Sequence, residues 1–386
     1  MIKKIIVNRF IDSLNTIEFG TLKLITPDKK EHYFEGNKEG VNATMIIHDH
    51  RAITNLIAKG DIGLTEAYRD NWWDTDNLTD LIKFALQNAD ALDRYVYGSK
   101  ISNIVSRILY SLRSNTLNGS KRNIHAHYDL GNEFYSLWLD KTMTYSSALY
   151  HTDSEDLQQA QYNKYDRIID RLEKSSGSLL EIGCGWGGFA ERATYRNDYD
   201  IKGITISDQQ YTYAKKIVEG KASILYQDYR KLDGKYDNIV SIEMFEAVGQ
   251  KFWPVYFNKI KSLLESKGKA IVQTITIDEI HFEKYRKTGD MIRSFIFPGG
   301  MLPSIEQFKL EAKKSGLQVV DYYAFGNSYA ATLSSWLENF EKNLDKIRSL
   351  NFDDRFIRIW RFYLSASIAS FTSNRTSVIQ AEIKHA

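Results

Sequence analysis

The stretch Leu179-Leu180-Glu181-Ile182-Gly183-Cys184-Gly185-Trp186-Gly187-Gly188 decides how this chain folds. An apolar run typical of a buried strand leads directly into a glycine cluster, and a helix is expected to begin near Phe189. Glycines 183, 185 and 187 let the backbone approach a ligand closely, because a Cβ atom at these positions would obstruct it. The pattern therefore indicates a nucleotide-type ligand held between a strand and a helix.

Two kinds of ligand compete for this glycine loop. A dinucleotide site and an S-adenosylmethionine site both combine a strand, a glycine cluster and a helix. The spacing here is G-x-G-x-G rather than the G-x-G-x-x-G of dinucleotide sites, and Glu181 stands before the first glycine. Both details favour S-adenosylmethionine, with Gly183, Gly185 and Gly187 lining its site.

Polar residues follow the next two predicted strands. The second strand ends in Gly203-Ile204-Thr205-Ile206-Ser207-Asp208-Gln209-Gln210, where a dinucleotide binder would place an acidic ribose ligand. Thr205 and Gln210 could hydrogen-bond a ribose or its neighbourhood there. After the third strand, Asp228 suits the exocyclic amine of an adenine and Tyr229 suits its π face. The alternative role for Asp228 is a helix cap.

Short apolar runs alternate with amphipathic helical patterns between residues 179 and 323. This alternation predicts βαβ units around a parallel sheet, and hence a doubly wound α/β domain. Two aromatic-rich helical patterns, 331–347 and 353–371, are expected to pack over the sheet or to shape an apolar pocket. The predicted strands are 179–182, 201–206, 223–226, 238–242, 270–277 and 318–322.

The rest of the chain predicts a second, smaller domain. Residues 1–98 mix short strand and helix patterns and predict an α+β module. A polar, basic linker over 99–120 separates it from a catalytic domain over 121–386. The linker cations form either an ordinary solvated helix and loop or a patch for lipid headgroups. Residues 285–298 also interleave cations with apolar side chains, which suits either headgroup contact or a lid.

Composition limits the function classes. The chain has 386 residues with 51 basic and 49 acidic side chains, so its net charge of +2 draws it neither to nucleic acid nor to an anionic membrane as a whole. Its single cysteine, Cys184, excludes an internal disulfide and a cysteine-based metal cluster, so we expect no metal and a reducing, cytoplasmic compartment. Residues 1–7 begin like a signal peptide, but Asn8, Arg9 and Asp12 interrupt the apolar stretch. With no apolar run of about 18 residues, any membrane contact is expected to be peripheral.

Six motifs lie in order along the chain, and together they resemble the cyclopropane-fatty-acid and mycolic-acid synthase family. The likeness covers residues 121–386, and the first domain resembles the N-terminal lipid-binding module of the bacterial synthases with weaker markers. The motifs are Asn123-Ile124-His125-Ala126-His127-Tyr128-Asp129-Leu130-Gly131-Asn132-Glu133-Phe134-Tyr135, Thr144-Tyr145-Ser146-Ser147-Ala148, Glu181 to Gly188, Ser241-Ile242-Glu243-Met244-Phe245-Glu246, Phe297-Pro298-Gly299-Gly300-Met301-Leu302-Pro303-Ser304 and Tyr329-Ala330-Ala331-Thr332-Leu333.

The resemblance implies a Rossmann-like class I methyltransferase domain that uses S-adenosylmethionine. It implies C-methylation of the double bond of unsaturated fatty acyl chains in phospholipids, giving a cyclopropane or a methyl-branched fatty acid. It also implies peripheral contact with the inner face of the membrane and a homodimer formed through the N-terminal module. Glu246 and Tyr329 would help to hold a bicarbonate ion beside the reacting alkene. The residues implied to line the cofactor site are Tyr145, Ser146, Gly183, Gly185, Thr205, Ile206, Gln210 and Tyr229.

Three departures from the family pattern affect the ion site. Ser147 stands where members with bicarbonate usually have cysteine, while Gln273 and Ala247 stand where histidine is common. Ser147 and Gln273 remain candidate catalytic residues, because both can hydrogen-bond. Gln273 cannot carry a proton near neutrality as imidazole can. We therefore expect an anion site that is retuned or absent, and a product that is either a ring or a methyl branch.

Two other functions are compatible with the same residues. One is a methyltransferase for a soluble small molecule with a closed pocket. The other is a non-catalytic lipid- or cofactor-binding homologue, which the substitutions at Ser147, Gln273 and Ala247 would explain. Glu246 and Tyr329, which are retained, count against the second.

Overall fold

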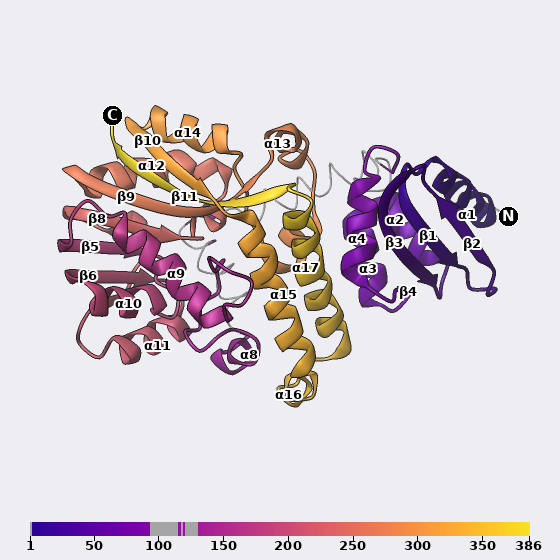
Figure 1. Ribbon diagram of the computed structural model, residues 1–386, viewed down its shortest axis with the longest axis horizontal. Coiled ribbons are helices and arrows are strands. Elements are labelled where there is room, and N and C mark those ends of the chain that lie inside the picture. The colour runs from indigo at the N-terminus through magenta and orange to yellow at the C-terminus, as the bar shows by residue number, and fades with distance from the viewer. Residues whose placement is uncertain (1, 93–114, 117–118, 120–129) are drawn as a thin grey trace. The chain divides into compact units, whose positions relative to one another are not determined.

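The computed structural model describes residues 2–92, 115–116, 119 and 130–386, and the described chain forms two compact units (Figure 1). The first unit joins the N-terminal residues, up to 112, with 283–298 and 344–375. The second unit contains 113–282, 299–343 and 376–386. Most of the predicted linker 99–120 and of the motif 123–135 lies outside the described residues. The predicted limits at 98 and 121 therefore stay predictions.

The first unit contains the predicted α+β module. Its four-stranded sheet has the order β2-β1-β3-β4, with β1 antiparallel to β2 and parallel to β3. Along β1 every second side chain is buried, Leu22 and Leu24 among them, so one face of this sheet meets the core. Its elements are α1 (Ile2–Ser13), a 3₁₀ turn (Leu14–Thr16), β1 (Phe19–Ile25), β2 (Glu31–Glu35), β3 (Lys38–Ile47), α2 (Arg51–Lys59), α3 (Asp61–Arg69), β4 (Trp73–Asp74) and α4 (Leu78–Gln87).

Helices from late in the chain complete the first unit. The π-helix Ile292–Ile296, α16 (Leu344–Ser349) and α17 (Asp354–Thr372) belong to it, and α17 contacts both α3 and α4. The ring of Phe362 on α17 lies 5.9 Å from that of Tyr68. Helix 353–371, which was expected to pack over the large sheet or to shape an apolar pocket, thus packs against α3 and α4 within the first unit, and its part in a pocket stays a prediction.

The second unit is built on a seven-stranded sheet of order β10-β11-β9-β8-β5-β6-β7. The five strands from β9 to β7 in this order are parallel, and β11 is antiparallel to β9 and to β10. The six predicted strands are all present. The strands are β5 (Ser176–Ile182), β6 (Asp198–Thr205), β7 (Ser223–Tyr226), β8 (Tyr236–Ile242), β9 (Leu264–Ile277), β10 (Leu317–Ala324) and β11 (Thr376–His385).

Sequence patterns missed β11, the yellow strand that lies between β9 and β10 in Figure 1. Its middle six residues are all buried, including the polar Gln380 and Glu382. Those polar side chains find partners inside the unit, because Gln380 bonds Gln273 and Arg167, and Glu382 pairs with Arg171. Polar residues that are satisfied by tertiary partners break the apolar run by which a central strand is recognised.

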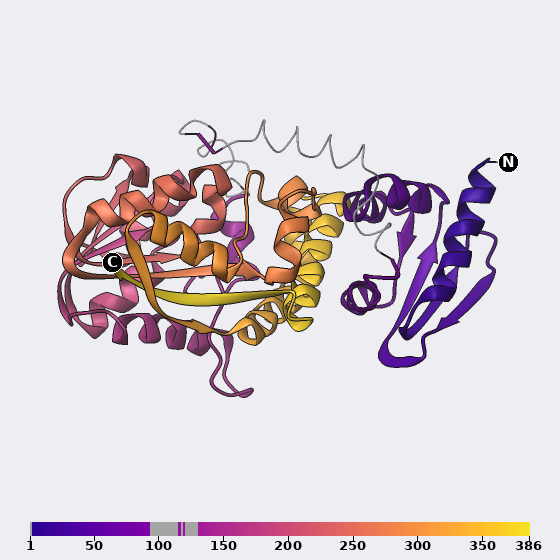
Figure 2. The same cartoon turned by 90° about the horizontal axis from the view of Figure 1, so that it is seen from above.

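Helices cover both faces of the large sheet (Figure 1, Figure 2). On one face α9, α10 and α11 bury Ile168, Phe189 and Ala214 against strand residues such as Ile201. The loops after β5, β6, β8 and β9 therefore gather at the carboxyl edge of the sheet, where α/β proteins bind ligands. The helices are α8 (Asn132–Ser136), α9 (Leu157–Asp170), α10 (Gly188–Arg196), α11 (Asp208–Val218), α12 (Trp253–Leu263), α13 (Glu279–Tyr285), α14 (Ile305–Lys314) and α15 (Gly326–Lys342), with 3₁₀ turns at Tyr229–Lys231, Phe245–Val248 and Gln250–Phe252.

Within the part of the chain that the structure describes, no helix combines the length and the apolar character needed to cross a membrane.

Candidate active site

The glycine loop joins β5 to α10, as predicted. Its three glycines have positive φ angles: +84° at Gly183, +53° at Gly185 and +91° at Gly187. A Cβ atom on Gly183 would lie 2.8 Å from Cγ of Met244, and one on Gly187 would lie 3.0 Å from Cβ of Ala214. A Cβ atom on Gly185 would meet no atom within 4 Å. The protein's own packing thus requires glycine at two of these positions, whereas Gly185 alone of the three faces open space, and the contact of all three with a ligand stays a prediction.

The end of β6 lies against this loop. The backbone N–H groups of Gly183 and Cys184 both donate to the carbonyl oxygen of Ile204, at 3.1 and 2.9 Å. Just beyond, Oγ1 of Thr205 donates to Oε1 of Gln210 at 2.8 Å. The structure therefore places this pair next to the glycine loop, as the sequence predicted, with the half-buried Ile206 between them in the chain.

Asp228 has the alternative role that the sequence allowed. Its carboxylate accepts from the backbone N–H of Arg230 at 3.0 Å and forms an ion pair of 2.6 Å with the guanidinium of the same arginine. It therefore caps the short 3₁₀ turn after β7, and its contact with an adenine stays a prediction. The neighbouring Tyr229 ring packs 5.8 Å from the ring of Tyr256, and burial raises the pKa of Tyr229 to about 12, which keeps the phenol neutral.

Aromatic side chains surround Tyr145. Its ring lies 5.5 Å from Tyr135, 5.3 Å from Trp138 and 5.3 Å from Trp336, and these three partners are fully buried. The Trp336 ring in turn lies 6.1 Å from that of Tyr329. This aromatic cluster joins the predicted cofactor residue Tyr145 to the predicted catalytic residue Tyr329, and it excludes water from the space between them.

Lys164 contacts Ser146, another residue predicted to line the cofactor site. Its Nζ donates to Oγ of Ser146 at 2.8 Å, and the lysine is fully buried. Burial lowers the pKa of Lys164 to about 7, although the negative charges of Glu243, Asp140 and Glu181 oppose this shift. Ser146 is therefore held by a buried cation that no sequence motif had indicated.

Glu243 is the functional residue that the sequence analysis missed. Its Oε1 accepts from the backbone N–H of Ser147 and from Nε2 of Gln273, both at 2.8 Å, and its Oε2 accepts from the hydroxyl of Tyr329 at 2.6 Å. Three predicted positions therefore meet on one carboxylate. The signal for Glu243 was its place directly after β8, because ligand-binding residues follow the carboxyl ends of parallel strands.

Glu246 has different hydrogen-bond partners from Glu243, and one of its carboxyl oxygens is buried. Its Oε1 accepts from Oγ1 of Thr274 at 3.0 Å and from the backbone N–H of Ile275, while its Oε2 is buried and has no partner among the described residues. Burial, and secondly the nearby charge of Glu243, raise the pKa of Glu246 to about 8. The structure thus places the hydroxyl of Tyr329 on Glu243, whereas the resemblance had linked Tyr329 with Glu246.

The raised pKa of Glu246 predicts how stability depends on pH. The folded chain keeps this proton up to about pH 8, whereas an unfolded carboxyl releases it near 4.5, so wild-type stability is lost as pH rises through that window. Glu246→Gln has no proton to lose, so we expect it to match the wild type at pH 4.5 and to exceed it at pH 9. One pKa unit corresponds to about 1.4 kcal/mol, so the melting temperature should rise by about 3 °C or more. Thermal melts at both pH values check this, and an equal difference at both would contradict it.

Two consecutive hydrogen bonds, from Arg167 to Gln380 and from Gln380 to Gln273, orient Gln273. Nη1 of Arg167 donates to Oε1 of Gln380 at 2.6 Å, and Nε2 of Gln380 donates to Oε1 of Gln273 at 3.0 Å. Gln380 and Gln273 face each other on the paired strands β11 and β9. Because the amide oxygen of Gln273 accepts from Gln380, its NH₂ group must point at Glu243. This is the physical role of the glutamine that departs from the family pattern.

The strand order, the glycine loop after the central strand β5 and the polar residues at the carboxyl ends of β6, β8 and β9 define a class I S-adenosylmethionine-dependent methyltransferase. The chain belongs to the mycolic acid cyclopropane synthetase family, which matches residues 116–381. The predicted resemblance is thereby confirmed.

Known proteins agree with this assignment. Tuberculostearic acid methyltransferase UfaA1 of Mycobacterium tuberculosis is 34% identical over 364 residues, which cover 87% of this chain and 82% of that protein. Cyclopropane-fatty-acyl-phospholipid synthase of Escherichia coli is 33% identical over 328 residues, which cover 82% of this chain and 81% of that enzyme. The solved structure of mycolic acid cyclopropane synthase CmaA1 complexed with SAH and CTAB is 30% identical, with a TM-score of 0.64 over 68% of this chain and 97% of that one.

Proposed function

We propose that this enzyme methylates the double bond of unsaturated fatty acyl chains in phospholipids. The observation that carries the proposal is the meeting of a cofactor loop, an aromatic cluster and the carboxylate of Glu243 in one unit. The names of the relatives support it, because they refer to a tuberculostearic acid methyltransferase and a cyclopropane-fatty-acyl-phospholipid synthase.

The residues present fit S-adenosylmethionine. Open space lies beside Gly185, and the Thr205–Gln210 pair stands at the adjoining strand end. The half-buried ring of Tyr229 and the cluster around Tyr145 offer apolar faces for the rest of the molecule. When bound, S-adenosylmethionine supplies an electrophilic methyl group. The residues of this chain position both partners and keep water out, which an isolated alkene needs because it is a poor nucleophile.

The product depends on what the chain does after methylation. A positive charge then remains on the neighbouring carbon of the acyl chain, and aromatic faces and a carboxylate stabilise it. Loss of a proton from the new methyl group closes a cyclopropane, whereas loss from an adjacent carbon leaves a methyl-branched alkene. The position of the base therefore selects between a ring and a branch.

Transfer of labelled methyl groups tests the proposed function. Full-length enzyme with labelled S-adenosylmethionine should label phospholipid vesicles that carry oleoyl chains and leave vesicles with only saturated chains unlabelled. Equal labelling of both would point to the headgroup and contradict the proposal. No transfer to either would favour a soluble substrate or a non-catalytic role.

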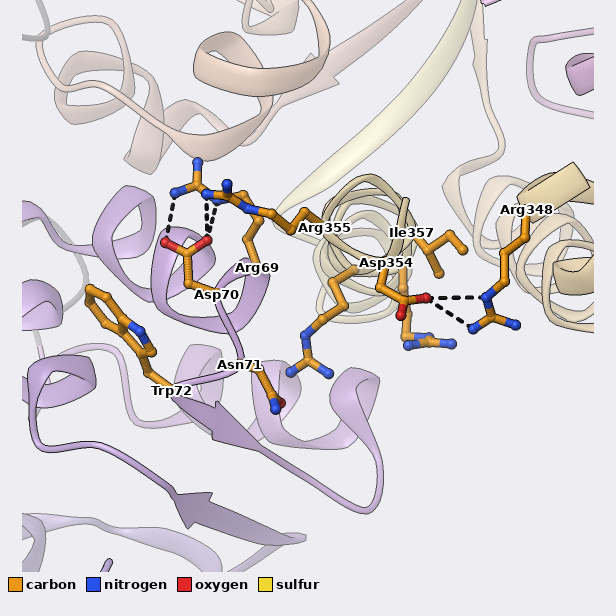
Figure 3. Close-up of a pocket in the computed structure, with 10 residues that line it drawn as sticks. Arg69, Asp70, Asn71, Trp72, Arg348, Asp354, Arg355 and Ile357 are labelled. Carbon is orange, nitrogen blue, oxygen red and sulfur yellow. Dashed lines mark hydrogen bonds and ion pairs between the residues drawn. The ribbon is translucent and has the colours of Figure 1, made fainter. Parts of the chain in front are cut away.

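We extend the proposal to peripheral contact with the inner face of the membrane, through an arginine-lined pocket in the first unit (Figure 3). The pocket has a volume of about 690 Å³, and five arginines and two aspartates line it. Asp70 pairs with Arg69 and Arg355, and Asp354 pairs with Arg348. The lining carries three more positive than negative side chains, of which Arg358 also pairs with Asp74 outside the lining, and this positive balance suits the phosphate of a lipid headgroup. Its lining residues are Arg69, Asp70, Asn71, Trp72, Arg348, Asp354, Arg355, Ile357, Arg358 and Arg361.

The segment 285–298 is less suited to this contact. Arg293 is buried, pairs with Asp290 and donates to the carbonyl oxygens of Tyr285 and Thr288, so it is a structural residue. Arg286 and Lys287 both pair with the exposed Glu283. Their local charge is partly balanced, which weakens the interaction with an anionic surface.

Vesicle sedimentation tests whether the arginine-lined pocket or the segment 285–298 contacts the membrane. Replacing Arg348 and Arg355, whose side chains are 49% and 60% exposed, with glutamate should weaken binding to vesicles rich in phosphatidylglycerol by roughly 10-fold. The matched control, Arg286 and Lys287 replaced with glutamate, should change binding much less. If the control loses more binding than the pocket variant, the membrane-facing surface is the segment 285–298 and the pocket assignment fails.

A further inference from the structure

A bicarbonate ion does not fit the site that the family resemblance implied. Ser147, Gln273 and Tyr329 already donate to the carboxylate of Glu243, at 2.6 to 2.8 Å. An added anion would lose these donors and would also stand beside a negative charge in a poorly solvated place. The structure instead presents a carboxylate of the chain itself at the point where those donors meet.

We propose that Glu243 is the catalytic base, built into the chain in place of a diffusible ion. The inference rests on the proposed function, because it concerns the proton that the methylated acyl chain must lose. After methylation, one carboxylate oxygen of Glu243 takes a proton either from the new methyl group, which closes a ring, or from a carbon next to the cationic centre, which leaves an alkene. The electrons of that C–H bond form a C–C bond or a C=C bond, the acyl chain becomes neutral, and Glu243 becomes a carboxylic acid that returns its proton to solvent.

The backbone places Glu243 next to the cofactor loop. Its N–H donates to the carbonyl oxygen of Gln273 at 2.8 Å, and its neighbour Met244 packs against Gly183, where a Cβ would lie 2.8 Å from Cγ of Met244. Glu243 adopts a φ of +48°, which is uncommon for a residue other than glycine. Such backbone strain persists where the surroundings impose it, and it collects at functional sites. The residue is half-buried, so part of it remains exposed.

The surroundings of Glu243 make its carboxylate a stronger base than one in water. Burial raises its pKa, while the hydrogen bonds from Tyr329, Gln273 and Ser147 and the charge of Lys164 act in the opposite direction. A carboxylate with a raised pKa binds a proton more strongly than one in water. Glu246 is a second buried carboxyl group nearby, and the charge of Glu243 contributes to raising the pKa of Glu246 to about 8.

Carboxylate removal and replacement test the proposal. Glu243→Gln keeps the size of the side chain and removes its basicity, so we expect methyl transfer to fall at least about 100-fold. Glu243→Ala leaves a space of carboxylate size between three donors, and we expect bicarbonate or formate to restore activity at least about 10-fold in this variant alone. Glu306→Gln, an exposed glutamate paired with Lys309, is the matched control and should keep wild-type activity.

Three measurements decide the outcome. Wild-type turnover should be the same in carbonate-free buffer and with added bicarbonate, and both Glu243 variants should bind S-adenosylhomocysteine as the wild type does in calorimetric titrations. A wild type that needs bicarbonate, a Glu243→Gln variant with near-normal turnover, or a folded, cofactor-binding Glu243→Ala variant that neither anion rescues would overturn the proposal. If the wild type itself transfers no methyl group to unsaturated lipid, the proposed function fails first.

Discussion

Replacing Gly185 with leucine is expected to abolish cofactor binding while leaving the fold intact. A Cβ atom at this position meets no protein atom within 4 Å, so the larger side chain enters the open space that we assign to S-adenosylmethionine. The cost to stability is limited, because a residue other than glycine at positive φ destabilises the folded backbone by about 1–2 kcal/mol. Calorimetric titration with S-adenosylhomocysteine should show affinity weakened by at least about 100-fold, equivalent to about 2.7 kcal/mol.

Gly220 offers a matched control for this experiment. It also has a positive φ, of +80°, and a Cβ atom there also meets nothing within 4 Å, but it follows α11 in the chain and is not among the residues predicted to line the cofactor site. Gly220→Leu should therefore show a similar fall in melting temperature with normal binding. Equal affinities in the two variants would show that the space beside Gly185 is not the cofactor site.

Replacing Lys164 with methionine is expected to move the acid limb of the pH–rate profile to higher pH. Lys164 lowers the pKa of Glu243 through its charge, and it carries that charge on the acid side of its own pKa of about 7. Without it Glu243 holds a proton to higher pH and cannot act as a base there. A shift of one pKa unit would lower the rate by about 10-fold on the acid limb.

The exposed Lys216 on α11 provides the control, because Lys216→Met removes a lysine without touching the buried carboxylates. Its profile should overlay that of the wild type. Cofactor affinity should also be measured for Lys164→Met, because Lys164 holds Ser146. An unshifted acid limb in a Lys164→Met variant that still turns over would show that Lys164 does not tune the base.

Local patterns predicted those parts of the fold that are built from local signals. The strand from Leu179, the glycine cluster and the six strands of the βαβ units depend on apolar runs and turn residues that are close in sequence. Strand β11 depends on distant partners, because its Gln380 is satisfied by Gln273 and Arg167. No window of sequence around residue 380 contains that information.

In the candidate site, too, local sequence signals predicted some residues, while others depend on contacts between distant parts of the chain. Gly185 and the Thr205–Gln210 pair follow strands directly, and the motif spacing was enough to find them. Glu243 lies in the motif 241–246, but the family pattern implies a role in that motif only for Glu246. Only the structure shows that Ser147, Gln273 and Tyr329, which are far apart in the chain, donate to the same carboxylate.

The central claim is that this chain adds a methyl-derived carbon to the double bond of a phospholipid acyl chain. The most direct measurement is mass spectrometry of the fatty acids released from unsaturated phospholipid after incubation with the enzyme and labelled S-adenosylmethionine. We expect an acyl chain heavier by one CH₂ unit that carries the label, and mild hydrogenation then separates a ring, which takes up no hydrogen, from a methyl-branched alkene. Unchanged fatty acids in the presence of enzyme that binds S-adenosylhomocysteine would contradict the proposed function.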